Sequence, residues 1–152
     1  MADTRRDQEY LGIDSNVLVA YLVPEHPDHE LTGTLTKKKH AVNPTVLHET
    51  YHTCVFKLRR NPQETVRVLL QYMNSSLCLP TNSSTVSLGL KLALKHHLGG
   101  RDALIIASYI SSKQVNKFVT LDQSLLSLKH VLEGGRRVKI VAPRLSRAKR
   151  SS

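Results

Sequence analysis

The stretch YLGIDSNVLVAYLV, residues 10–23, decides the fold class of this 152-residue chain. Its first part, Tyr10–Ile13, is a short apolar run that predicts a buried strand ending at Asp14. The apolar segment Asn16–Val23 follows at once and predicts a helix. A carboxylate therefore stands where a strand passes into a helix, and in an open parallel sheet ligands bind outside the carboxyl ends of the strands.

The same alternation of strand and helix continues along the chain. Further strands are expected at His40–Val42, Leu77–Leu79, Phe118–Thr120 and Val138–Val141. Helices are expected at residues 25–36, 44–58, 62–73, 81–97, 103–110 and 123–128. This order predicts one α/β domain at residues 10–142, with a parallel sheet covered on both faces. Residues 1–9 are predicted to be an N-terminal extension, and residues 143–152 a basic, mobile tail.

The charge balance favours a polyanionic partner. The formal net charge is +10, and after residue 30 the chain has twenty Lys and Arg but only five acids. Such a balance favours nucleic acid or another acidic partner. The start of the chain does not resemble a signal peptide and no apolar run approaches the length of a membrane span, so a cytoplasmic protein is expected.

Four acids, Asp14, Glu49, Asp102 and Asp122, are the candidate site. Asp122 stands just beyond the strand ending at Thr120, and Asp102 begins the apolar helix that continues to Ile110. Glu49 lies in the first two turns of the helix after Pro44, off its apolar stripe. Four carboxylates brought together would repel one another unless a divalent cation lay between them. Mg²⁺ or Mn²⁺, which prefer oxygen ligands, suit this set.

Helix capping also accounts for some of these residues. Asp14, Asp102 and Asp122 each precede a helical segment, and Asp is a favoured N-cap residue. The capping role and a metal-binding role are compatible, so both interpretations stay open for each Asp.

Four segments resemble the motifs of the PIN-domain nucleases, including the VapC-like ribonucleases. They are LGIDSNVL (11–18), VLHE (46–49), GGRDALIIA (99–107) and FVTLD (118–122). The resemblance implies a three-layer α/β/α sandwich with a central, mostly parallel sheet and cleavage of single-stranded RNA with Mg²⁺ or Mn²⁺. Asp14, Glu49, Asp102 and Asp122 match the acidic quartet of the family, and Ser15, Asn16 and Thr120 match its supporting polar positions.

The resemblance also implies partners. It suggests a homodimer that acts either as the toxin of a toxin–antitoxin pair, with an antitoxin as partner, or as an RNA-processing factor with a processing partner. Arg101, Lys37, Lys38 and Lys39 are candidates to position the RNA phosphates, although a solvated basic surface explains any single lysine equally well.

Two other functions have support in the sequence. His48-Glu49-Thr50-Tyr51-His52 spells H-E-x-x-H, the signature of zinc metalloproteases, on a predicted helix. A protease, however, gives no role to Asp14, Asp102 and Asp122. The second alternative is an RNA-binding module without catalysis on the same fold, because fold alone does not fix function.

Overall fold

The computed structural model describes residues 9–144. The predicted extension and basic tail therefore lie almost entirely outside the described residues. Within residues 9–144, no helix has the length and apolar character needed to cross a membrane.

The sheet has six strands in the order β3-β2-β1-β4-β6-β5. They are β1 (Tyr10–Ile13), β2 (His40–Val42), β3 (Leu77–Cys78), β4 (Val115–Val119), β5 (His130–Glu133) and β6 (Arg136–Val141). All neighbouring pairs are parallel except β5 and β6, which form an antiparallel hairpin. The predicted α/β class with a mostly parallel sheet is confirmed.

Strand β5 was not predicted from the sequence. Only Val131 of its four residues is fully buried, so its apolar signal is weak. The turn to β6 is made by Gly134 and Gly135, whose φ angles of 57° and 79° suit glycine. The pair Gly134-Gly135 was therefore the only local sign of this hairpin.

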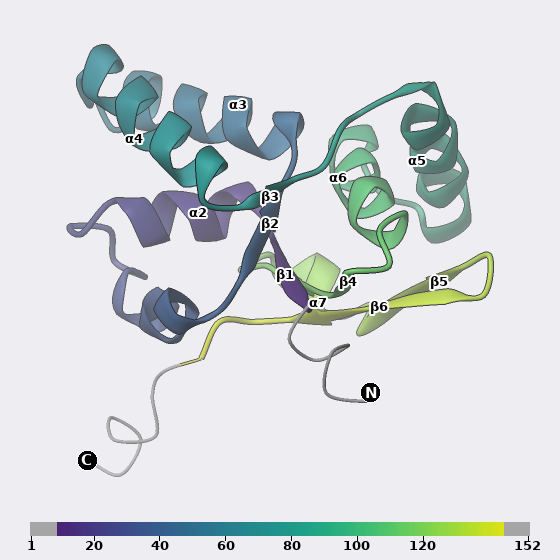
Figure 1. Cartoon of the computed structure of the whole chain (residues 1–152). Coiled ribbons are helices and arrows are strands. Elements are labelled where there is room, and N and C mark those ends of the chain that lie inside the picture. The colour runs from purple at the N-terminus through teal and green to yellow at the C-terminus, as the bar shows by residue number, and fades with distance from the viewer. Residues whose placement is uncertain (1–8, 145–152) are drawn as a thin grey trace, which may run out of the picture.

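Apart from the short α7, the helices fall into two groups on either side of strands β1–β3 (Figure 1). They are α2 (Ser15–Leu22), η1 (Glu30–Lys37), α3 (Pro44–His52), η2 (Thr53–Lys57), α4 (Pro62–Asn74), α5 (Ser83–His96), α6 (Gly100–Ile110) and α7 (Gln123–Leu126). Two differ from prediction: residues 30–37 form a 3₁₀-helix, and the helix after Pro44 becomes a π-helix at Thr53. Asn43 and Asn61 cap α3 and α4 as predicted, each accepting a hydrogen bond from a backbone N–H three residues on.

Side chains from helices cover both faces of the sheet near β1. On one face Gly12 lies directly under the ring of Tyr109 from α6. On the other face the His40 ring of β2 contacts Tyr72 of α4, at 2.7 Å between Nδ1 and the hydroxyl oxygen, and the backbone carbonyl of Leu35 in η1. The two layers position β1, whose end bears Asp14.

The predicted covering of both faces is incomplete at β4 and β6. Phe118 and Ile140 are buried, whereas Lys117 and Lys139, which alternate with them, are exposed. These two lysines line a cavity of about 490 Å³ between the sheet and η1. This gap was not predicted, because periodicity alone does not reveal where a helical layer ends.

Replacing Gly12 with alanine should destabilise the domain. A Cβ at this position would lie 2.7 Å from two atoms of the Tyr109 ring. That ring is fully buried, and its hydroxyl donates to the Ile13 carbonyl, so it has little freedom to move. We expect Gly12→Ala to lower the free energy of unfolding by about 2 kcal/mol, measured by urea denaturation. Gly33→Ala is the control, because beyond its own helical backbone no atom lies within 4 Å of its Cβ position; an equal loss of stability in both variants would contradict this explanation.

Candidate active site

Asp14 is held at the end of β1 by two hydrogen bonds. Its Oδ1 accepts from the backbone N–H of Ser15 at 2.8 Å, which caps α2, and its Oδ2 accepts from the hydroxyl of Thr120 at 2.7 Å. The residue is only 4% exposed. Burial, reinforced by the charges of Asp102 and Glu49, raises the pKa of Asp14 to about 6 in spite of these hydrogen bonds.

Glu49 reaches toward Asp14 from the second turn of α3. One carboxylate oxygen accepts a hydrogen bond from the Ser15 hydroxyl. The other forms an ion pair with Nε of Arg101 at 2.8 Å. Three segments far apart in the sequence, at the starts of α2, α3 and α6, therefore meet around the carboxylate of Glu49.

Asp102 and Asp122 complete the group of acids. Asp102 lies in the first turn of α6, where partial burial and then the charge of Asp122 raise its pKa, although Arg101 opposes the shift. Asp122 caps α7: its Oδ1 accepts from the hydroxyl and backbone N–H of Ser124, and these bonds lower its pKa. The predicted capping role thus holds for Asp14 and Asp122, whereas Asp102 lies inside its helix and Gly99 is the N-cap residue.

Asn16 and Thr120 link the two central strand ends. The Asn16 carbonyl oxygen accepts from the backbone N–H of Leu121 at 3.1 Å. The Thr120 hydroxyl, fully buried, donates to Asp14 and accepts from the backbone N–H of Asp122 at 3.1 Å. A single hydroxyl therefore fixes the positions of two of the four acids.

Two supporting residues were missed from the sequence. Tyr109 donates to the carbonyls of Ile13 and Ala41, which stabilises the ends of β1 and β2 directly before the site. Ser124 fixes the Asp122 carboxylate. In the sequence, the one sign of a role for Tyr109 was its hydroxyl group in a mostly apolar, buried helix. Ser124 could not be distinguished from any other serine near the start of a helix.

Beside burial, charges within the group act on two of the four acids. Asp102 and Glu49 raise the pKa of Asp14, and Asp122 and Glu49 raise the pKa of Asp102. Among residues 9–144, no three His, Cys, Asp or Glu side chains are arranged to hold a metal ion as they stand. The donor set is nevertheless all oxygen, and a divalent cation would relieve the mutual repulsion, so these residues fit Mg²⁺ or Mn²⁺ in chemistry.

The histidines of the H-E-x-x-H stretch do not join Glu49. His48 is exposed and its Nδ1 lies 2.9 Å from the carbonyl of Pro44. The His52 ring packs against Phe56, with 5.2 Å between ring centroids. Because Glu49 contacts Ser15 and Arg101 instead, the geometry gives the zinc-protease interpretation no support.

The predicted basic residues lie in two places. Arg101 is at the acidic site, with its guanidinium against Glu49 and most of its side chain exposed. Lys37 ends η1 and is exposed, whereas Lys38 and Lys39 line the cavity beside β1 and β4. None of the four acids lines that cavity.

The fold and site define an α/β protein with a group of four carboxylates, one buried and three partly exposed, near the carboxyl ends of its central strands. The PIN domain family model matches residues 12–131, and the chain belongs to this family. No curated protein sequence matches the chain.

Solved structures show the same fold at low sequence identity. VapC20 of Mycobacterium tuberculosis, described as a sarcin-ricin loop cleaving toxin, has a TM-score of 0.65 at 13% identity, covering 80% of this chain and 96% of its own. A toxin–antitoxin complex from Klebsiella pneumoniae has a TM-score of 0.63 at 15% identity, covering 91% and 100%. VapBC2 of Rickettsia felis, bound to a DNA fragment from its promoter, has a TM-score of 0.61 at 11% identity, covering 88% and 98%.

Proposed function

We propose that this protein is an endoribonuclease that uses Mg²⁺ or Mn²⁺ to hydrolyse phosphodiester bonds of single-stranded RNA. The observation that carries the proposal is the buried Asp14, whose pKa of about 6 reflects burial and the nearby acids Asp102 and Glu49. A cluster of carboxylates costs stability, and such clusters occur where chemistry requires them. Membership of the PIN domain family and the charge of +10 support the same function.

Each acid has a distinct role in this proposal. Asp14, Asp102 and Asp122 would hold the cation, and Glu49 would bind a second ion or orient the attacking water. When bound, the cation supplies positive charge to the transition state and lowers the pKa of water. Thr120, Ser15 and Asn16 hold the acids in place, while Arg101, whose side chain is mostly exposed beside Glu49, would contact a phosphate of the RNA.

The biological setting we favour is a toxin–antitoxin pair. The similar structures include a toxin–antitoxin complex from Klebsiella pneumoniae, which supports an antitoxin as protein partner. An RNA-processing factor is the alternative setting. We further propose a homodimer, for which the exposed apolar residues Val66 and Leu70 on α4 offer contact surface.

The decisive experiment is RNA cleavage by purified protein in EDTA, Mg²⁺, Mn²⁺ or Zn²⁺, beside Asp102→Asn and His52→Ala. We expect cleavage only with Mg²⁺ or Mn²⁺, a loss of at least about 100-fold in Asp102→Asn, and normal activity in His52→Ala. The His52 variant is a useful control because its ring is exposed and packs only against Phe56 among the aromatic residues described.

Other results would redirect the proposal. Full activity in Asp102→Asn would exclude the acidic site as the catalytic centre. Binding of RNA without cleavage in the presence of any of these metal ions would favour the non-catalytic RNA-binding module. Loss of a zinc-dependent peptidase activity in His52→Ala would favour the protease.

A further inference from the structure

A row of cations crosses the open half of the sheet, away from the acidic site. Lys117 of β4 is the register partner of Lys139 of β6, and both side chains are exposed on the same face. Neighbouring strands lie about 4.8 Å apart, so the two lysine stems begin side by side. Like charges directly opposite each other in a sheet are destabilising.

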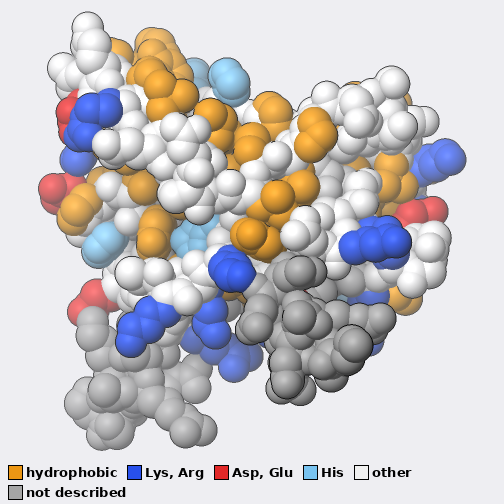
Figure 2. All heavy atoms as spheres, viewed as in Figure 1, with side chains coloured by type: hydrophobic (Ala, Val, Ile, Leu, Met, Phe, Trp, Pro, Cys, Tyr) orange, Lys and Arg blue, Asp and Glu red, His pale blue; other side chains and the backbone are white. Residues whose placement is uncertain are grey.

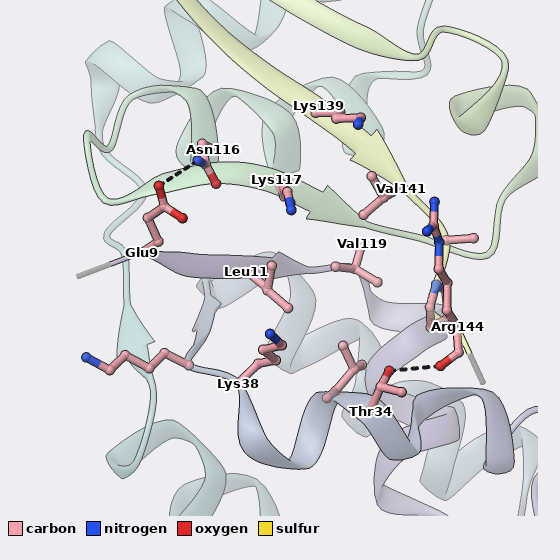
Figure 3. Close-up of a pocket in the computed structure, with 14 residues that line it drawn as sticks. Glu9, Leu11, Thr34, Lys38, Asn116, Lys117, Val119, Lys139, Val141 and Arg144 are labelled. Atoms are coloured by element: carbon pink, nitrogen blue, oxygen red, sulfur yellow. Dashed lines mark hydrogen bonds between the residues drawn. The ribbon is translucent and has the colours of Figure 1, made fainter. Parts of the chain in front are cut away.

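More cations surround this pair. Lys38 faces it from the η1 side and Arg144 lies at one end of the same cavity (Figure 3), which Lys39 also lines. Glu9 is the one acid among the lining residues, and its carboxylate accepts a hydrogen bond from Asn116. Among residues 9–144, Lys117 and Lys139 form no ion pair with a carboxylate. Figure 2 shows several Lys and Arg side chains close together in the lower part of the molecule.

The floor of the cavity connects this surface to the acids. Val119 lines the cavity and directly precedes Thr120, whose hydroxyl donates to Asp14. Val141 also lines it, and its carbonyl accepts from the backbone N–H of Thr120 at 3.0 Å. The cavity therefore ends at the same strand ends that bear the acidic site.

We propose that this lysine face, comprising Lys38, Lys117, Lys139 and Arg144, binds the phosphates of the RNA strand that flanks the scissile bond. The inference rests on the proposed nuclease function. A polyanion accounts for the paired lysines because its phosphates neutralise their repulsion. RNA is favoured over an acidic protein segment because a bound strand continues from this face to the acids that would cut it.

The chemistry of the face predicts how the RNA is bound. Among residues 9–144, the one contact between a cation and an aromatic ring joins Lys39, beside the face, to Tyr10, with 5.8 Å between Nζ and the ring centroid. Stacking on bases therefore contributes little, and phosphate contacts dominate. Binding should depend strongly on salt and on RNA length and only weakly on base sequence.

The test measures RNA binding without cleavage. A labelled single-stranded RNA of about 20 nucleotides is titrated with protein in EDTA and followed by fluorescence anisotropy at several salt concentrations. The double variant Lys117→Gln/Lys139→Gln is compared with Lys117→Arg/Lys139→Arg and with Lys57→Gln/Lys91→Gln. The last pair removes two exposed lysines from η2 and α5 and so matches the change in charge.

We expect the glutamine variant at the lysine face to bind roughly tenfold more weakly at about 0.1 M salt, since each single-strand phosphate contact contributes about 0.7 to the salt slope. Its slope of log K against log salt should be less negative by about 1.4. The arginine variant should bind like the wild type, and the Lys57/Lys91 control should keep the wild-type slope. Thermal unfolding should show the glutamine variant at least as stable as the wild type, because a repulsive pair is removed.

Several results would overturn the inference. An equal loss of RNA affinity in the Lys57/Lys91 control variant would show that the effect comes from net charge and not from the lysine face. Unchanged RNA binding in the glutamine variant, with lost binding of an acidic peptide such as polyglutamate, would assign the face to a protein partner. The assay also separates this inference from the nuclease: loss of binding in EDTA supports the lysine face even if no metal activates cleavage, and normal binding rejects it even in an active enzyme.

Discussion

Asp14→Asn should abolish RNA cleavage and at the same time make the protein more stable at pH 7. The carboxylate is buried, and its pKa of about 6 shows that the folded protein disfavours the charge. We expect the cleavage rate to fall by at least about 10³-fold, because the cation loses its most buried ligand. Asparagine keeps the shape of the side chain and an oxygen that can accept from the N–H of Ser15, so α2 stays capped.

The gain in stability follows from the direction of the pKa shift. The folded state binds the Asp14 proton more tightly than the unfolded state, in which the pKa is 3.8. The stability of the folded protein therefore falls as pH rises from about 4 to about 6. A difference of about 2 pKa units corresponds to about 3 kcal/mol, of which the amide should recover about 2 kcal/mol at pH 7. Urea denaturation at pH 5 and pH 7 measures the effect, and the variant should lose most of the pH dependence.

Asp28→Asn provides the matched control, because this residue lies between α2 and η1 and outside the acidic site. It should leave both cleavage and the pH dependence of stability unchanged. An Asp14→Asn protein that still cuts RNA at the wild-type rate, or that is less stable than the wild type at pH 7, would contradict the assignment of Asp14 as a strained metal ligand.

The central part of the fold and the acidic site could be predicted from the sequence because local signals specify them. Tyr10–Ile13 followed by Asp14 indicates a strand end, and Asn43-Pro44 and Asn61-Pro62 indicate helix starts that the structure confirms. Parallel strands with helical crossovers then bring Asp14 and Asp122 to one edge of the sheet, since topology alone places strand ends together.

The features that were missed depend on long-range packing. Strand β5 buries little surface of its own and pairs only through β6. The ion pair between Arg101 and Glu49 joins α6 to α3, and nothing in either segment alone specifies it. The open lysine face likewise depends on where η1 ends over the sheet, a tertiary feature that hydrophobic periodicity does not encode.

Mn²⁺ should cancel the pH dependence of stability between pH 5 and pH 7. Without metal, stability falls between pH 5 and pH 7, because Asp14 gives up its proton less readily in the folded state than in the unfolded state. The pKa of Asp102 is raised as well, so this residue contributes in the same direction. A cation at the site requires both carboxylates in the charged form, so protons compete with it. With a pKa of about 6 for Asp14, the apparent affinity for Mn²⁺ should rise about tenfold from pH 5 to pH 7.

Thermal unfolding with and without Mn²⁺ at a series of pH values tests this cancellation without any RNA. A ligand that binds only the folded protein adds RT ln(1 + [L]/Kd) to stability, so a tenfold lower Kd at pH 7 than at pH 5 adds about 1.4 kcal/mol at saturating Mn²⁺. That increase offsets the loss of about 1 kcal/mol that Asp14 alone contributes over this pH range. Stability in saturating Mn²⁺ should therefore be nearly independent of pH from pH 5 to pH 7, and the stabilisation by Mn²⁺ should grow over this range in the wild type but not in Asp14→Asn. An affinity for Mn²⁺ that is equal at pH 5 and pH 7 would show that the ion is held by groups other than these carboxylates.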